Sequence, residues 1–119
     1  MDVPKANPLL GTWRYPAPDD PDGIGYLHYS GKGCAFFSSR NLTVGGKHAL
    51  VKLRYTLESE SMIRVRSNGS PEGWLSTYYV EGDSLVLVTN GLRMECARIS
   101  MDEIPDWFLE DLARALSLP

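Results

Sequence analysis

The stretch GWLSTYYVEGDSLVLVTNGLRMECARI, residues 73–99, contains three alternating segments separated by two short turn sequences. Apolar and polar residues alternate with a period of two, which is typical of β-strands that bury one face. Asn90-Gly91 is the pair preferred in a two-residue type I′ hairpin loop, and Gly82-Asp83 occupies the preceding connection. The strands expected from this pattern are 73–81, 84–89 and 92–99.

These two turns determine which side chains share a face. A two-residue loop at Asn90-Gly91 places Leu87 opposite Met94, and the loop at Gly82-Asp83 places Tyr78 opposite Leu87. Directly opposed residues point to the same side of a sheet. The inward set is then Trp74, Ser76, Tyr78, Val80, Leu85, Leu87, Thr89, Leu92, Met94, Cys96 and Arg98.

The preceding part of the chain continues the same pattern. Further strands are expected at 10–16, 24–30, 33–39, 49–58 and 62–67. A turn at Gly31-Lys32 would place Leu27 opposite Phe36 and Tyr29 opposite Cys34, so that Phe36 points inward. Leu57 and Ile63 share a face only if the connection between them has an odd number of loop residues, which we expect here. The pattern predicts an all-β protein, an eight-stranded antiparallel up-and-down β-barrel over 9–99, in a single domain spanning 1–119.

Residues 104–117 are expected to form a helix. Ile104, Phe108, Leu112 and Leu116 recur at four-residue spacing, and Pro105 suits a first helical turn. The outward positions of the last three strands are also apolar: Leu75, Tyr79, Val86, Val88, Ala97 and Ile99. We expect the helix to cover that outer face; the alternative is that the helix or the face forms a homodimer interface.

Composition narrows the possible partners. The 119 residues carry a net charge of −3 with no basic stripe, which argues against a nucleic-acid partner. The chain has no apolar run of about 18 residues, as a membrane span requires, and its first ten residues contain no apolar signal segment. A cytoplasmic location is therefore expected, although a mature secreted form would look the same. Cys34 and Cys96 are expected to be buried thiols.

Gly11-Thr12-Trp13 opens the strand series, and an inward Arg98 ends it. With the patterns at 25–33 and 79–87, this arrangement resembles the calycin superfamily, and most closely the small bacterial lipocalin-like proteins. The resemblance implies that Trp13 closes one end of the barrel and that Arg98 packs across it. A guanidinium over an indole face contributes about 0.5–2 kcal/mol. The alternative for Arg98 is a solvated charge on the opposite face.

Several inward residues carry hydroxyl groups, which need hydrogen-bond partners when buried. They are compatible either with a cavity inside the barrel or with a filled interior in which hydroxyls bond to one another. For a cavity, the candidate ligand-binding residues are Tyr29, Phe36, Tyr55, Trp74, Tyr78, Leu87 and Met94.

Three functions remain open from the sequence. The first is binding of a small, partly apolar ligand inside the barrel. The second is an inhibitor or immunity-type interaction module with a filled barrel, acting through loops 17–23, 40–48 and 67–73. The third is an enzyme that uses the same pocket. His28 is expected to point outward and His48 lies in a Gly-rich connection, so neither suggests a metal site, and no cofactor or catalytic residue is assigned.

Overall fold

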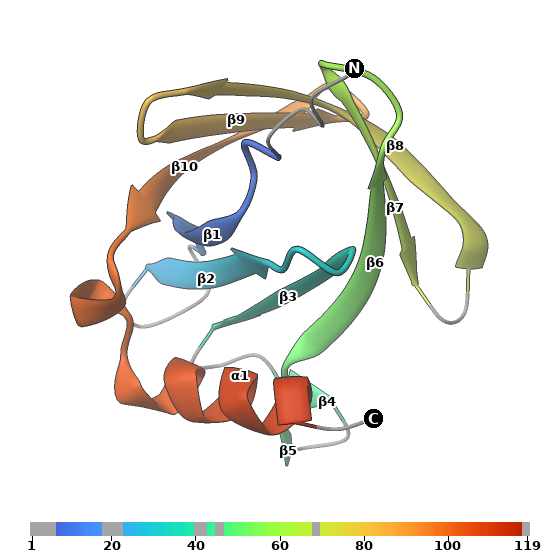
Figure 1. Ribbon diagram of the computed structural model, residues 1–119. Coiled ribbons are helices and arrows are strands. Elements are labelled where there is room, and N and C mark those ends of the chain that lie inside the picture. The colour runs from blue at the N-terminus through green and yellow to red at the C-terminus, as the bar shows by residue number, and fades with distance from the viewer. Residues whose placement is uncertain (1–6, 18–22, 40–42, 45–46, 68–69, 118–119) are drawn as a thin grey trace, which may run out of the picture.

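The computed structural model describes residues 7–17, 23–39, 43–44, 47–67 and 70–117, in which the chain forms a closed antiparallel β-barrel and a C-terminal helix (Figure 1). Around the barrel the strands follow the order β1-β10-β9-β8-β7-β6-β3-β2. The elements are β1 Gly11–Pro16, β2 Ile24–Tyr29, β3 Cys34–Ser39, β4 Thr43–Val44, β5 Lys47–His48, β6 Val51–Leu57, β7 Met62–Ser67, β8 Ser70–Glu81, β9 Ser84–Thr89, β10 Leu92–Ile99, the 3-10 turn η1 Met101–Glu103 and α1 Asp106–Ser117. The predicted eight-stranded barrel is confirmed, and the short β4–β5 hairpin is an addition to it.

The predicted registers of β8, β9 and β10 are confirmed. The pairs include Leu87 with Met94, Leu85 with Cys96, Tyr78 with Leu87 and Val80 with Leu85. Asn90 and Gly91 both have positive φ, 52° and 80°, as a type I′ turn requires. Leu57 pairs with Ile63 across the 58–62 connection, so the odd loop length expected there is also correct.

The predicted register of β2 against β3 is wrong by one residue. The Ser30 N–H donates to the Cys34 carbonyl over 2.8 Å, so the loop has three residues, 31–33, instead of two. Gly33 takes a φ of +79°, the left-handed residue that ends this kind of three-residue hairpin loop. Tyr29 therefore pairs with Ala35, and Phe36 points out of the barrel.

Trp13 and Arg98 meet at one end of the barrel, as expected from the sequence. They are paired residues on β1 and β10, and the guanidinium carbon lies 4.2 Å from the indole ring centroid. Trp13 is fully buried, and its Nε1–H donates to the Leu9 carbonyl over 2.9 Å. Arg98 donates to the carbonyls of Leu10 and Pro8 over 2.7 and 3.1 Å, which ties the segment before β1 across this end.

The C-terminal helix packs on a different face from the one expected. α1 lies along the outside of β2 and β3 (Figure 1), where Tyr26 contacts Phe108 with ring centroids 5.5 Å apart. Phe36, which the three-residue loop turns outward, joins Phe108 and Leu112 in this second core. Of the outward residues on which the expected docking face on β8, β9 and β10 was based, Ile99 joins this second core. α1 does not cover the outer side chains of β8, where Tyr79 is 58% exposed. No described helix has the length and apolar character needed to cross a membrane.

Candidate functional site

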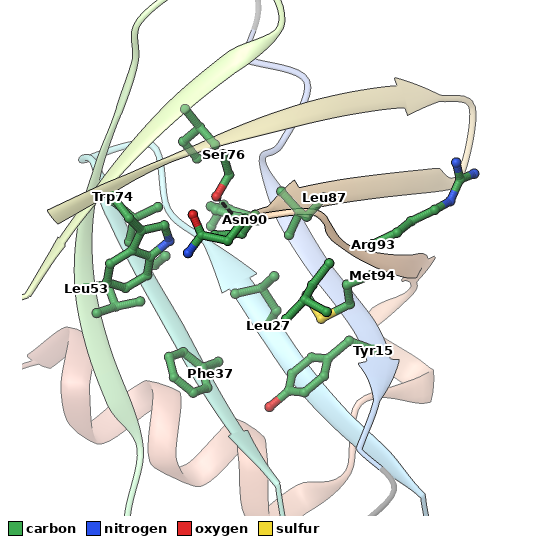
Figure 2. Close-up of a pocket in the computed structure, with 16 residues that line it drawn as sticks. Tyr15, Leu27, Phe37, Leu53, Trp74, Ser76, Leu87, Asn90, Arg93 and Met94 are labelled. Atoms are coloured by element: carbon green, nitrogen blue, oxygen red, sulfur yellow. Dashed lines mark hydrogen bonds between the residues drawn. The ribbon is translucent and has the colours of Figure 1, made fainter.

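A cavity of about 400 Å³ occupies the barrel interior (Figure 2). Its lining comes from all eight barrel strands and from the β9–β10 turn. The lining residues are Tyr15, Leu27, Tyr29, Ala35, Phe37, Leu53, Ile63, Val65, Trp74, Ser76, Leu87, Thr89, Asn90, Leu92, Arg93 and Met94. Most of these side chains are aliphatic or aromatic, a composition typical of small-molecule sites.

The cavity has its mouth at the end of the barrel opposite Trp13. Trp74 is 38% exposed and Leu92 is 77% exposed, and both line the space together with Asn90 of the β9–β10 turn. The loops proposed for a protein partner, 17–23, 40–48 and 67–73, fall partly outside the described residues, namely at 18–22, 40–42, 45–46 and 68–69.

Tyrosines form the floor of the barrel toward its closed end. The rings of Tyr29 and Tyr55 meet edge to face with centroids 5.1 Å apart. The Tyr55 hydroxyl donates to the Ser30 carbonyl and accepts from Asn7 Nδ2, both over 2.7 Å. Tyr55 is therefore occupied by the chain itself, whereas Tyr29 borders the cavity.

The structure brings four of the seven predicted ligand-binding residues to the cavity wall: Tyr29, Trp74, Leu87 and Met94. Phe36 is wrong, because the three-residue loop turns it outward to pack against α1. Tyr55 and Tyr78 are buried inside the barrel but are not part of the wall. The Tyr78 hydroxyl donates to the Ser59 carbonyl over 3.4 Å.

Sequence reasoning missed Tyr15 and Phe37, which point into the lower part of the cavity in Figure 2. Tyr15 follows the inward Trp13 by two residues, so the period of two was a sufficient signal for it. Its ring lies over Gly25 on β2, and a Cβ at Gly25 would overlap that ring. Gly25 thus makes room for an aromatic side chain that forms part of the wall.

A second hollow, of about 360 Å³, lies where β1 and β10 part. Their pairing stops at Arg14 with Ala97, and beyond it the hollow is lined by residues that include Pro16, Glu95 and Cys96. Tyr15 contributes to the lining of both spaces.

The described wall offers hydroxyl groups in place of acids, bases or metal ligands. It contains no histidine, carboxylate or cysteine side chain. The hydroxyls of Ser76 and Thr89 lie 2.6 Å apart and hydrogen-bond to each other. Burial raises the pKa of Tyr29 well above its usual value, so this hydroxyl stays protonated and is available to donate a hydrogen bond. Among the described residues there is also no cluster of three potential metal ligands.

Cys96 is a buried free thiol near the closed end of the barrel, and its burial can be tested by the pH dependence of stability. Burial raises the pKa of Cys96 from 9.0 to about 12. Between these values the unfolded chain has lost a proton that the folded chain keeps, so stability must fall as the pH rises. We expect Cys96 to contribute a fall of about 1.4 kcal/mol per pH unit from pH 9 upward. Urea unfolding at several pH values measures this slope.

The matched variants are Cys96→Ala and Cys34→Ala. Cys34 is only partly buried and lies on the outer face of β3 near α1. The alkaline slope between pH 9 and 10 should flatten in Cys96→Ala and persist in Cys34→Ala. An unchanged slope in Cys96→Ala would show that burial does not raise the pKa of this thiol.

Comparisons of the chain with protein-family models, with curated proteins and with solved structures gave no match in any of the three cases. The resemblance to the calycin superfamily therefore stays a prediction, and the function has to be argued from the cavity itself.

Proposed function

We propose that this protein binds a small, mainly apolar ligand inside the barrel. The observation that carries the proposal is the cavity of about 400 Å³, walled by aliphatic and aromatic side chains and reached past Trp74. Protein interiors are normally close-packed, and unfilled volume destabilises a fold. A barrel that keeps such a space in place of larger side chains favours binding over a purely structural role.

A tryptophan in place of Leu87 tests the proposal. Leu87 lines the cavity, so the larger side chain should occupy the space that a ligand needs. The probe is N-phenyl-1-naphthylamine, an uncharged fluorophore that brightens in apolar surroundings. We expect saturable binding to the unmodified protein and an affinity lower by about tenfold or more in Leu87→Trp. Native mass spectrometry of the purified protein gives an independent stoichiometry.

Val86→Trp is the matched control. Val86 is the neighbouring residue on β9, but it points outward and pairs with Tyr79 and Glu95 on the outer surface. This variant introduces the same side chain on the other side of the barrel wall, so probe affinity should not change. Equal loss of binding in both variants, or no binding to the unmodified protein, would contradict an interior site.

The residues that line the cavity give less support to the two other functions, an interaction module and an enzyme. An interaction module needs no interior space, and an enzyme needs acid or base groups that converge on the pocket. The only titratable side chains of the described wall are Tyr15, Tyr29 and Arg93. A stoichiometric protein companion in the native mass spectrum would favour the interaction module over ligand binding.

A further inference from the structure

Charged groups are kept out of the cavity. Arg93 is the only charged residue among those that line it, and its neighbours Leu92 and Met94 are the inward residues of β10. Arg93 reaches away from the other labelled side chains in Figure 2, and its Nη2 donates to Glu95 Oε1 over 3.2 Å on the exposed surface. Arg98 lies at the closed end against Trp13 and does not line the cavity.

A polar group does border the cavity at its floor. Tyr29 is 4% exposed and lines the space, yet its hydroxyl makes no hydrogen bond to any described residue. Among the described residues, every side-chain nitrogen or oxygen that has no accessible surface makes a hydrogen bond. Because the Tyr29 oxygen makes none, it must have some accessible surface and therefore borders open space. Buried hydroxyl groups normally find a partner, and here a bound molecule can supply it.

The two observations together define the chemistry of the ligand. We propose that the cavity takes an uncharged molecule with one hydrogen-bonding oxygen, an alcohol or ketone, and that the Tyr29 hydroxyl binds that oxygen. This inference rests on the proposed function and adds a ligand class to it. An ion that enters a cavity with such a wall loses its hydration without gaining a countercharge. We therefore expect carboxylates and protonated amines to bind more weakly than uncharged ligands.

A series of ligands with one chain length tests the inference on the unmodified protein. 1-Decanol, decanoate and decylammonium are titrated at pH 7, below their micelle concentrations, to displace N-phenyl-1-naphthylamine. We expect 1-decanol to bind at least about tenfold more tightly than either charged analogue. As a second comparison, 8-anilino-1-naphthalenesulfonate carries the same ring system as the probe plus a sulfonate, and it should bind more weakly than the probe.

Tyr29→Phe removes the hydroxyl and keeps the ring. The affinity for 1-decanol should fall about twofold to tenfold, the effect of one hydrogen bond. Tyr78→Phe is the control, because it removes the same atom from a buried tyrosine that does not line the cavity. Its affinity for 1-decanol should equal that of the unmodified protein.

The outcomes distinguish a failure of the proposed ligand class from a failure of the proposed binding function. If the probe binds but decanoate or decylammonium matches 1-decanol, the assignment of an uncharged ligand is overturned while interior binding stands. If Tyr29→Phe keeps full affinity for 1-decanol, the role of Tyr29 is overturned. If neither the probe nor any member of the series binds, the proposed function itself fails. The ligand series needs no variant, so a folding defect in Tyr29→Phe would not remove the test.

Discussion

Replacing Trp13 by alanine is expected to lower the free energy of unfolding by about 3–5 kcal/mol, the usual range for a buried tryptophan. The indole fills the closed end of the barrel, donates to the Leu9 carbonyl and lies beneath the Arg98 guanidinium. Its loss leaves a cavity, removes the hydrogen-bond donor of the Leu9 carbonyl and removes the aromatic ring beneath the Arg98 guanidinium. For a domain of this size the midpoint of thermal unfolding should fall by roughly 10–25 °C. Urea and thermal unfolding followed by circular dichroism measure both quantities.

Trp74→Ala provides the comparison at the other end of the barrel. It removes the same atoms from a side chain that is 38% exposed at the mouth, so the stability lost should be clearly smaller. The two variants also differ in function, because only Trp74 lines the cavity. Equal losses of stability would mean that Trp13 does not close the barrel in the way described.

A double-mutant cycle isolates the contact between the indole and the guanidinium. Arg98→Ala, Trp13→Ala and the double variant should give a coupling free energy of about 0.5–2 kcal/mol. Gly11 belongs to the same arrangement: it has a φ of +115°, and a Cβ there would lie 3.0 Å from Arg98 Nη1. Additive losses would show that Arg98 contributes through its other partners, the carbonyls of Leu10 and Pro8 and the Asp83 carboxylate 3.7 Å from its Nε.

The strand registers were predicted correctly where the connecting loop had the expected number of residues. Gly82-Asp83 and Asn90-Gly91 occupy two-residue loops, and every strand register that depended on them is correct. The 31–33 loop has one residue more than expected, and a shift of one residue moves every side chain of a strand to the other face. Gly33 was the signal, because a glycine in third place permits the left-handed residue of a longer loop.

The same shift places Phe36 on the outer face of β3, where α1 packs. The sequence places Phe36 inward and predicts that the helix covers the apolar outer face of the last three strands, β8, β9 and β10. In the structure Tyr26 and Phe36 offer α1 an aromatic surface, and η1 turns the chain from Ile99 toward it. The helix itself was predictable from its own spacing, but its docking face depended on a tertiary register.

The cavity is a property that strand patterns do not contain. Alternation identifies which side chains point inward, and most of the wall was predictable in that sense. Whether those side chains fill the interior depends on the barrel's diameter and on where each ring lies. The tyrosines show this: Tyr55 is held by Asn7 and Ser30, whereas Tyr29 is left facing the space.

Gly73→Ala is the second large effect expected, about 2–4 kcal/mol of lost stability. Gly73 lies at the irregularity between β7 and β8, where the pairing moves from Val65 with Trp74 to Ser67 with Ser70. Its φ is +61°, a conformation that costs an L-residue about 1–2 kcal/mol. A Cβ would in addition overlap the Val65 carbonyl, so the two strands would have to separate beside the mouth of the cavity.

Gly82→Ala separates the two causes. Gly82 has nearly the same φ, +59°, but a Cβ there would meet nothing within 4 Å. It should therefore show only the conformational penalty of about 1–2 kcal/mol, and the difference between the variants measures the overlap with Val65. Because Trp74 follows Gly73 directly and lines the cavity, Gly73→Ala should also weaken binding of N-phenyl-1-naphthylamine, whereas Gly82→Ala should not. Equal stability losses in the two variants would mean that β7 and β8 do not approach each other closely at Gly73, and that this edge of the mouth is wider than the structure shows.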